Sequence, residues 1–255
     1  MGQYYVIANL DRRTGYTPRA LGDGVKLHEF GYGGATMESL VHLLAGPWSS
    51  DRIALIGDYT EPGELPDAAT NAAGMDSHLI YPCITGEAAT WVDASPEARE
   101  HLAGLLTHSE YKRVDLDGTE TTVQYSEYLP PVTVPEHGPA QVIVNLDKNE
   151  QITPAGFGDP AHREGFAVHG GGGGILTALT VLLATGVGKG NAMLGSWTGD
   201  RIAVVDADSS AAVGSQAINR DVRELLADDE WATYTVNGGA VTRQCVGFDE
   251  GAGIE

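Results

Sequence analysis

Runs of apolar residues divide the chain into two sets of elements in the same order. Each set opens with a short continuous apolar run, at residues 4–10 and again at 141–146, which is typical of a largely buried strand. A second run of this kind, at 52–57 in the first set and 201–206 in the second, predicts another buried strand. Polar, glycine-containing segments separate the two strands of each set.

Apolar residues at helical spacing predict helices in each set. In the second set, one stripe over about three turns is formed by Ile175, Leu176, Leu179, Leu182 and Leu183. The equivalent apolar segment of the first set, 40–44, ends before Gly46, a residue type that favours helix termination. A later helix is predicted to begin at Ser95-Pro96 and, in the second set, at Asn219.

Each set closes with a predicted hairpin. Strands at 111–116 and 231–236 lead into Asp117-Gly118 and Asn237-Gly238, dipeptides that suit a type I′ turn. The element order of one set is therefore β-α-β-α-β-β. Such a unit predicts a two-layer α+β fold in which the helices cover one face of the sheet.

Sequence strings also repeat between the two sets. VIANLD at 6–11 recurs as VIVNLD at 142–147, and WSSDRIA at 48–54 recurs as WTGDRIA at 197–203. Self-similarity at a fixed offset is the sign of a repeated structural unit. We therefore predict a tandem duplication whose two pseudo-symmetric halves pack into one body.

The duplication sets the expected domain boundaries. The first repeat is predicted over 1–124 and the second over 140–255, with a proline-rich connector over 125–139. The first repeat also carries an insertion over 59–94 that the second lacks. Its length and its prolines predict a long ordered loop or lid.

The charge of the chain limits its partners. Asp and Glu number 35 and Lys and Arg 15, which gives a net charge of −20. Because affinity for nucleic acid comes largely from basic side chains, we do not expect nucleic acid to be a direct partner. The acidic, lysine-poor composition is halophile-like and equally typical of a mesophile with GC-rich codons.

Other compositional features concern location. The sequence has no apolar run of about eighteen residues and opens directly into a strand, so we expect neither a membrane span nor a signal peptide. Cys83 and Cys245 stand at non-equivalent places in the two halves, which favours separate buried thiols in a reducing compartment. We therefore expect a soluble, cytoplasmic protein or a component of a particle assembled in the cytoplasm.

A glycine run before the predicted helix at 175 is a candidate anion-binding site. Backbone N–H groups and the helix dipole would converge there, with no side chain to block the approach. The residues are His169, Gly170, Gly171, Gly172, Gly173 and Gly174. A glycine loop without a ligand is the alternative. The phosphate-loop motif is not met, because Gly190 follows Lys189 where Ser or Thr is required.

Acids that follow the predicted strands of the second half are candidate metal ligands. With one histidine, they would make an oxygen-rich site suited to Mg²⁺ or Ca²⁺. These residues are Asp147, Asp159, His162 and Asp206. No other cofactor is predicted. Because Asn-Leu-Asp and Gly-Asp occur in both halves, a turn-forming role explains the acids more simply.

The repeated strings supply three pairs of equivalent residues. The pairs are Asp11 with Asp147, Trp48 with Trp197, and Arg52 with Arg201. Each arginine stands at a strand entrance, where its guanidinium could clamp a carboxylate. Arg201 is thus a further candidate for binding a ligand anion. We favour an internal ion pair with the tryptophan packed over it, because a contact that holds the fold is needed in both copies.

Three strings of the first half are similar to an uncharacterised group of bacterial, archaeal and fungal proteins. They are GQYYVI-x-NLD at 2–11, GDG-x-KL-x-EF at 22–30 and W-x-x-DRIA-x-x-GDY at 48–59. The resemblance implies no activity and assigns no catalytic residue.

These observations favour a non-enzymatic, acidic component that works by self-association or by binding a protein partner. The alternative is a metal-dependent hydrolase or a phosphate-ligand enzyme that uses the glycine run and the loop-end aspartates. Convergence of Asp147, Asp159 and a histidine on one point would favour the enzyme.

Overall fold

The structure is a computed structural model of the chain. It describes residues 3–31, 34–86, 90–100, 102, 106–114, 119–128, 138–159, 161, 174–186, 192–226, 232–237 and 240–245.

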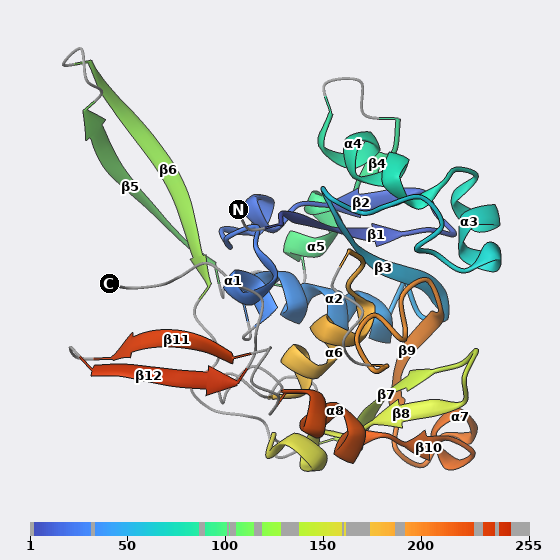
Figure 1. Cartoon of the computed structure of the whole chain (residues 1–255). Coiled ribbons are helices and arrows are strands. Elements are labelled where there is room, and N and C mark those ends of the chain that lie inside the picture. Colours follow the sequence, from blue (N-terminus) through green and yellow to red (C-terminus); the bar gives the residue numbers. More distant parts are fainter. Residues whose placement is uncertain are drawn as a thin grey trace.

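A mixed eight-stranded sheet forms the centre of the molecule (Figure 1). Its strands are β1 (Tyr5–Asn9), β2 (Thr14–Tyr16), β3 (Asp51–Gly57), β4 (Val92–Asp93), β7 (Gln141–Asn145), β8 (Glu150–Ile152), β9 (Arg201–Asp206) and β10 (Gln216–Ala217). They lie in the order β10-β8-β7-β9-β3-β1-β2-β4. Outward from the antiparallel β3–β9 pair, each side adds two antiparallel pairings and then one parallel pairing.

Helices cover one face of this sheet in both halves. They are η1 (Pro18–Leu21), α1 (Leu27–Gly31), α2 (Ala35–Ala45), α5 (Ser95–Glu100), η3 (Pro154–Phe157), α6 (Ile175–Leu183) and α8 (Asn219–Leu226). Their apolar side chains form one large core with every second strand residue, such as Ile7, Leu55 and Ile143. Together with the mixed sheet, these helices confirm the predicted α+β class. None of the helices in the described residues is long and apolar enough to span a membrane.

The opposite face of the sheet is covered as well, which differs from the predicted two-layer arrangement. The covering elements are α3 (Asp67–Ala73), η2 (Ser77–Leu79), α4 (Ile80–Thr85) and α7 (Ser210–Val213). In the first half, Val6, Ala8 and Ile56 pack in a second core that includes residues of α3 and α4. Segment 59–94, predicted as a loop or lid, therefore contains the helices that bury this face.

The sequence pattern does not predict strands β2, β4, β8 and β10. Each has only two or three residues, and the β4 and β10 side chains are exposed. Their strand conformation comes from pairing at the edges of the sheet, so apolar periodicity carries no signal for them.

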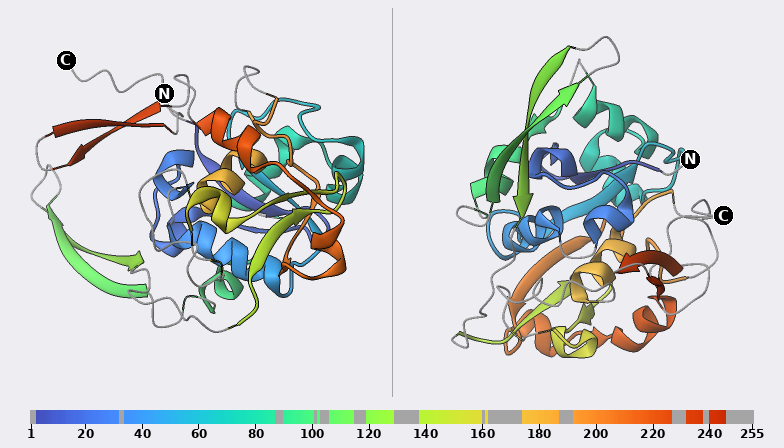
Figure 2. Two further views of the ribbon diagram at one scale, coloured as in Figure 1. Left: turned by 90° about the horizontal axis from the view of Figure 1, so that it is seen from below. Right: turned by 90° about the vertical axis from the view of Figure 1, so that its left-hand side faces the viewer.

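Two hairpins stand apart from the eight-stranded sheet. One pairs β5 (Leu106–Val114) with β6 (Glu120–Tyr128), and the other pairs β11 (Ala232–Asn237) with β12 (Ala240–Cys245). Both lie on the same side of the main body (Figures 1 and 2). Strand β6 extends to Tyr128, into the predicted connector, while the predicted turn at 117–118 lies outside the described residues.

Candidate functional site

The repeated strings contact each other within the first half. The Asn9 Nδ2 group donates to Asp51 Oδ2 at 2.9 Å. The Arg52 backbone N–H donates to Asp11 Oδ2 at 2.6 Å, and its Nη1 lies 3.1 Å from Oδ1 of the same carboxylate. The end of β1 is thereby fixed to the start of β3.

The second half contains the same contacts. Asn145 Nδ2 donates to Asp200 Oδ2 at 2.8 Å, while the backbone N–H of Arg201 donates to Asp147 at 2.9 Å. The guanidinium of Arg201 forms an ion pair with Asp147 at 2.7 Å. Arg201, a candidate for binding a ligand anion, therefore already has a carboxylate partner.

The two sets of contacts meet at the centre of the sheet. Strand β3 pairs with β9 so that Arg52 lies opposite Arg201. Partial burial opposes ionisation of Asp147, but the hydrogen bonds and charge of Arg201, with a smaller effect of Arg52, hold its pKa below the usual range. Charge from both halves thus stabilises this junction.

Trp48 and Trp197 lie in the core. Trp48 Nε1 donates to Glu97 at 3.3 Å, and its ring centroid is 6.0 Å from that of Tyr16. Trp197 Nε1 donates to Glu150 at 2.6 Å. The tryptophans therefore anchor the loops before β3 and β9 through core packing and one hydrogen bond each.

The candidate metal ligands have separate partners. Asp147 contacts Arg201, Asp206 lies 3.5 Å from Gln141 Nε2, and Asp159 Oδ2 accepts the backbone N–H of Ile175 at 2.6 Å. His162 lies outside the described residues. Among the described residues, no group of three or more His, Cys, Asp or Glu side chains is placed to hold a metal ion.

The candidate anion site lies mostly outside the described residues, which exclude His169 and residues 170–173. Gly174 is described and immediately precedes α6. The N-terminus of this helix is already occupied, because the Asp159 carboxylate caps the Ile175 N–H. A Cβ atom at Gly174 would lie 3.0 Å from that carboxylate, so glycine permits the close approach.

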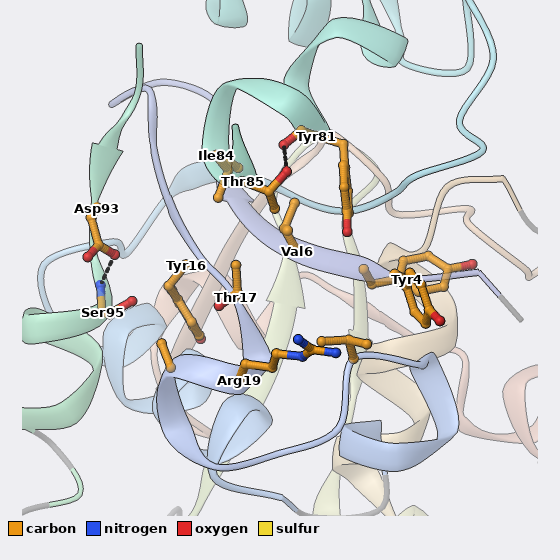
Figure 3. Close-up of a pocket in the computed structure, with 13 residues that line it drawn as sticks. Tyr4, Val6, Tyr16, Thr17, Arg19, Tyr81, Ile84, Thr85, Asp93 and Ser95 are labelled. Atoms are coloured by element: carbon orange, nitrogen blue, oxygen red, sulfur yellow. Dashed lines mark hydrogen bonds between the residues drawn. The ribbon is translucent and has the colours of Figure 1, made fainter. Parts of the chain in front are cut away.

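A pocket of about 570 Å³ lies in the first half, where β1, η1, α4 and the start of α5 meet (Figure 3). Four tyrosines contribute to its wall: Tyr4, Tyr5, Tyr16 and Tyr81. The Tyr16 hydroxyl donates to the Thr36 carbonyl at 2.9 Å, and the Tyr5 hydroxyl donates to Gln3 at 2.9 Å. These two hydroxyls are therefore engaged outside the pocket.

The hydroxyls of Tyr4 and Tyr81 have no hydrogen-bond acceptor among the described residues. Burial and the nearby Asp58 raise the pKa of Tyr81, while Arg19 lowers it. The net shift is upward, so the hydroxyl stays protonated near neutral pH and can donate a hydrogen bond.

Two further donors belong to residues that line the pocket. The Arg19 guanidinium extends from η1 beneath the tyrosines (Figure 3) and, in the described part of the chain, has neither a carboxylate nor a carbonyl partner. The backbone N–H of Thr17 also has no acceptor there. Asp93, which accepts the Ser95 N–H at 2.9 Å, lies away from the guanidinium in Figure 3.

At the equivalent place in the second half, the backbone donor has an acceptor. The pairing registers match Tyr16 with Ile152, and the sequence offset from there matches Thr17 with Thr153. Asn219 Oδ1 accepts the Thr153 N–H at 2.8 Å, and Asn219 Nδ2 lies 2.8 Å from the Thr153 hydroxyl. The donor that stays open in the first half is therefore satisfied in the second.

The two halves also differ at three neighbouring pairs of equivalent positions. Ser95 stands in place of Asn219, Arg19 in place of Ala155, and Ala20 in place of Gly156. A Cβ atom at position 156 would lie only 2.4 Å from Cγ of Asn219. Alanine at one position and asparagine at the other are thus sterically incompatible in this geometry, and each half has a compatible pair.

The sequence pattern does not predict this pocket. Its residues come from separate segments between Tyr4 and Ser95 and follow no local motif. Aligning the two halves residue by residue does reveal one sign of it, because Arg19 stands in place of Ala155 directly after the shared Thr-Pro.

Comparisons of the chain with protein-family models, with curated proteins and with solved structures gave no match.

Proposed function

We propose that this protein is a tandem-duplicated, non-enzymatic component that works by self-association. The matching strand pairings on each side of the β3–β9 pair support the duplication. So do the paired contacts Asn9–Asp51 and Asn145–Asp200, which join the same repeated strings in each half. The residues shared by the two halves thus stabilise the fold. We therefore look for the function in the parts of the chain outside the eight-stranded sheet.

The two hairpins β5–β6 and β11–β12, which we call the arms, are the elements best suited to self-association. In the described part of the chain, neither arm pairs with a third strand, so the outer edges of its strands remain open. An isolated two-stranded hairpin is at best marginally stable in water. Open strand edges also present N–H and C=O groups in the geometry that another strand can pair with. This is the observation on which the proposal rests.

The charge of the arms favours a second copy of the chain as the partner. The four arm strands contain three basic and three acidic residues, whereas the whole chain carries −20. Two copies that met through their bodies would bring like charges together. Contact through the arms avoids most of that repulsion.

The positions of the candidate metal ligands and of Arg201 also support a binding role. Asp147 and Arg201 neutralise each other at the sheet junction, and Asp159 caps α6. We therefore prefer the binding function to the metal-dependent hydrolase. Within this proposal, nucleic acid is not a partner and the cytoplasm is the expected location.

Shortening one arm tests the proposal. Replacing residues 109–125 with Asn-Gly retains the register pairs from Leu106–Tyr128 to His108–Ser126 and supplies a type I′ turn. Light scattering should give a multiple of the 26.8 kDa chain mass for the natural protein and a smaller mass for the variant. A natural protein that is monomeric at every concentration, or an unchanged mass in the shortened variant, would contradict the proposal.

A pair of charge variants provides the control. Lys112→Glu adds negative charge to the first arm, where the lysine side chain is 72% exposed and forms an ion pair with Glu120. Arg223→Glu makes the same charge change on an exposed position of α8 in the body. Lys112→Glu should weaken association at low salt more than Arg223→Glu does, and molar salt should reduce the difference.

A further inference from the structure

We infer that the tyrosine-lined pocket of the first half binds a small molecule with a flat aromatic body and one carboxylate or phosphate group. This inference does not depend on the self-association proposed above. The pocket volume of about 570 Å³ lies within the range of small-molecule sites.

Two donors without an acceptor in the described part of the protein indicate the anionic group. The Arg19 guanidinium is permanently charged and, in the part of the chain that the structure describes, lacks an acidic partner despite the net charge of −20. The Thr17 N–H, two residues earlier, also lacks an acceptor there. A carboxylate or phosphate can accept from a guanidinium and from a backbone N–H at once.

The tyrosines indicate the rest of the ligand. Tyr16 and Tyr5 line the pocket, and hydrogen bonds of their hydroxyls to residues that do not line it fix their positions. Tyr81 stands on α4 and Tyr4 before β1, and both keep free hydroxyls among the described residues (Figure 3). Rigid aromatic walls with a few polar groups suit a flat ring that carries a polar substituent.

The equivalent positions of the second half do not offer the same two donors. There, Asn219 accepts the Thr153 N–H, and Ala155 stands in place of Arg19. The helix α4 that carries Tyr81 belongs to the insertion of the first half. The first half therefore differs from the second in η1, in α4 and at the start of α5, which all contribute residues to the pocket wall.

Two substitutions can transfer the contacts of Asn219 to the first half. In the double variant Ala20→Gly/Ser95→Asn, the asparagine can accept the Thr17 N–H as Asn219 accepts that of Thr153. Glycine at position 20 removes the Cβ atom that would collide with the new side chain. The fold should tolerate this change, since the second half already contains it.

The test measures the binding of phenyl phosphate, benzoate, inorganic phosphate and benzyl alcohol by ligand-observed NMR. Phenyl phosphate or benzoate should bind, and the preferred one identifies the anionic group. Arg19→Ala should weaken that binding about tenfold to a hundredfold, and Ala20→Gly/Ser95→Asn should abolish it. The matched control Gly156→Ala/Asn219→Ser changes the other half and should leave binding unchanged.

Other results would overturn the inference. One is no binding of phenyl phosphate or benzoate at about 10 mM, well above the dissociation constants of specific small ligands. A second is binding that persists in both first-half variants while their thermal unfolding stays like that of the natural protein. Benzyl alcohol that binds as tightly as the anionic probes would refute the role of Arg19. Inorganic phosphate that binds as tightly as phenyl phosphate would refute the role of the tyrosines.

Discussion

The carboxylate of Asp23 is expected to hold helix α2 in place from a distant loop. Helix α2 begins after Gly34, which has no side chain to cap it. Asp23 Oδ2 instead accepts the Thr36 N–H at 2.7 Å, and a Cβ atom at Gly34 would lie 2.6 Å from that oxygen. Nearly all of α2 is buried in the main core, so its position affects the whole sheet.

Asp23→Ala removes this cap. Loss of a capping acceptor costs about 1–2 kcal/mol. For a chain of this size, a loss of that order lowers the Tm by about 2–8 °C. Asp23→Asn keeps an acceptor, so it should cost less than about 0.5 kcal/mol at neutral pH.

The pH dependence distinguishes the two substitutions further. Burial raises the pKa of Asp23, against the hydrogen bonds from Thr36 and Ala35, which lower it. A raised pKa in the folded state means that the contribution of Asp23 to stability is greatest at low pH and falls as pH rises through that pKa. The Tm of Asp23→Asn relative to the natural protein should therefore increase from about pH 4 to pH 7.

Thermal unfolding followed by circular dichroism provides the assay. Asp159 in the second half is the matched position, because it caps α6 in the same way. Asp159→Ala and Asp159→Asn should differ in the same direction. Equal losses for the alanine and asparagine variants at position 23, or a relative Tm of Asp23→Asn that falls with rising pH, would refute the reasoning.

Three further predictions concern residues at or near the junction of β3 and β9. The pKa of Asp147 is lowered in the folded state, so its contribution to stability is present above the unfolded pKa and is lost at low pH. In denaturation experiments from about pH 5 to pH 2, the stability advantage of the natural protein over Asp147→Asn should therefore shrink as the pH falls. Gly199 has φ +77°, and a Cβ atom there would lie 2.6 Å from Ala69, so Gly199→Ala should lower the unfolding free energy by about 1–2 kcal/mol or more in urea titration. Ser50, with φ +69°, stands at the corresponding place, and Ser50→Gly should raise it by up to about 1 kcal/mol. A loss in Ser50→Gly would contradict the strain argument.

The long buried elements were predictable from the sequence. Strands β1, β3, β7 and β9 lie within one or two residues of the apolar runs, and helices α2 and α6 cover the segments with helical spacing. Their signal is strong because burial on both faces of a sheet requires a continuous apolar run. Ser95 and Asn219 also begin helices where their capping chemistry indicates.

Features that depend on contacts between distant segments were not predictable. The covering of the second face by α3 and α4 depends on where segment 59–94 folds back onto the sheet, which its prolines do not reveal. The pocket is lined by Arg19, Tyr81 and Ser95 from separate elements, and none of the three belongs to a local sequence motif. Asp159 could be recognised as functional or structural only once its distance to Ile175 was known.

The central claim is that the arms pair with a second copy of the chain. Amide hydrogen exchange of segments 106–114 and 120–128, measured at low and high protein concentration, tests it most directly, with β1 as an internal reference that stays protected. We predict that more arm amides exchange slowly at high concentration, because their outward N–H groups become hydrogen-bonded across the interface. Exchange of the arm amides that does not change with concentration, in protein whose β1 remains protected, would contradict the account.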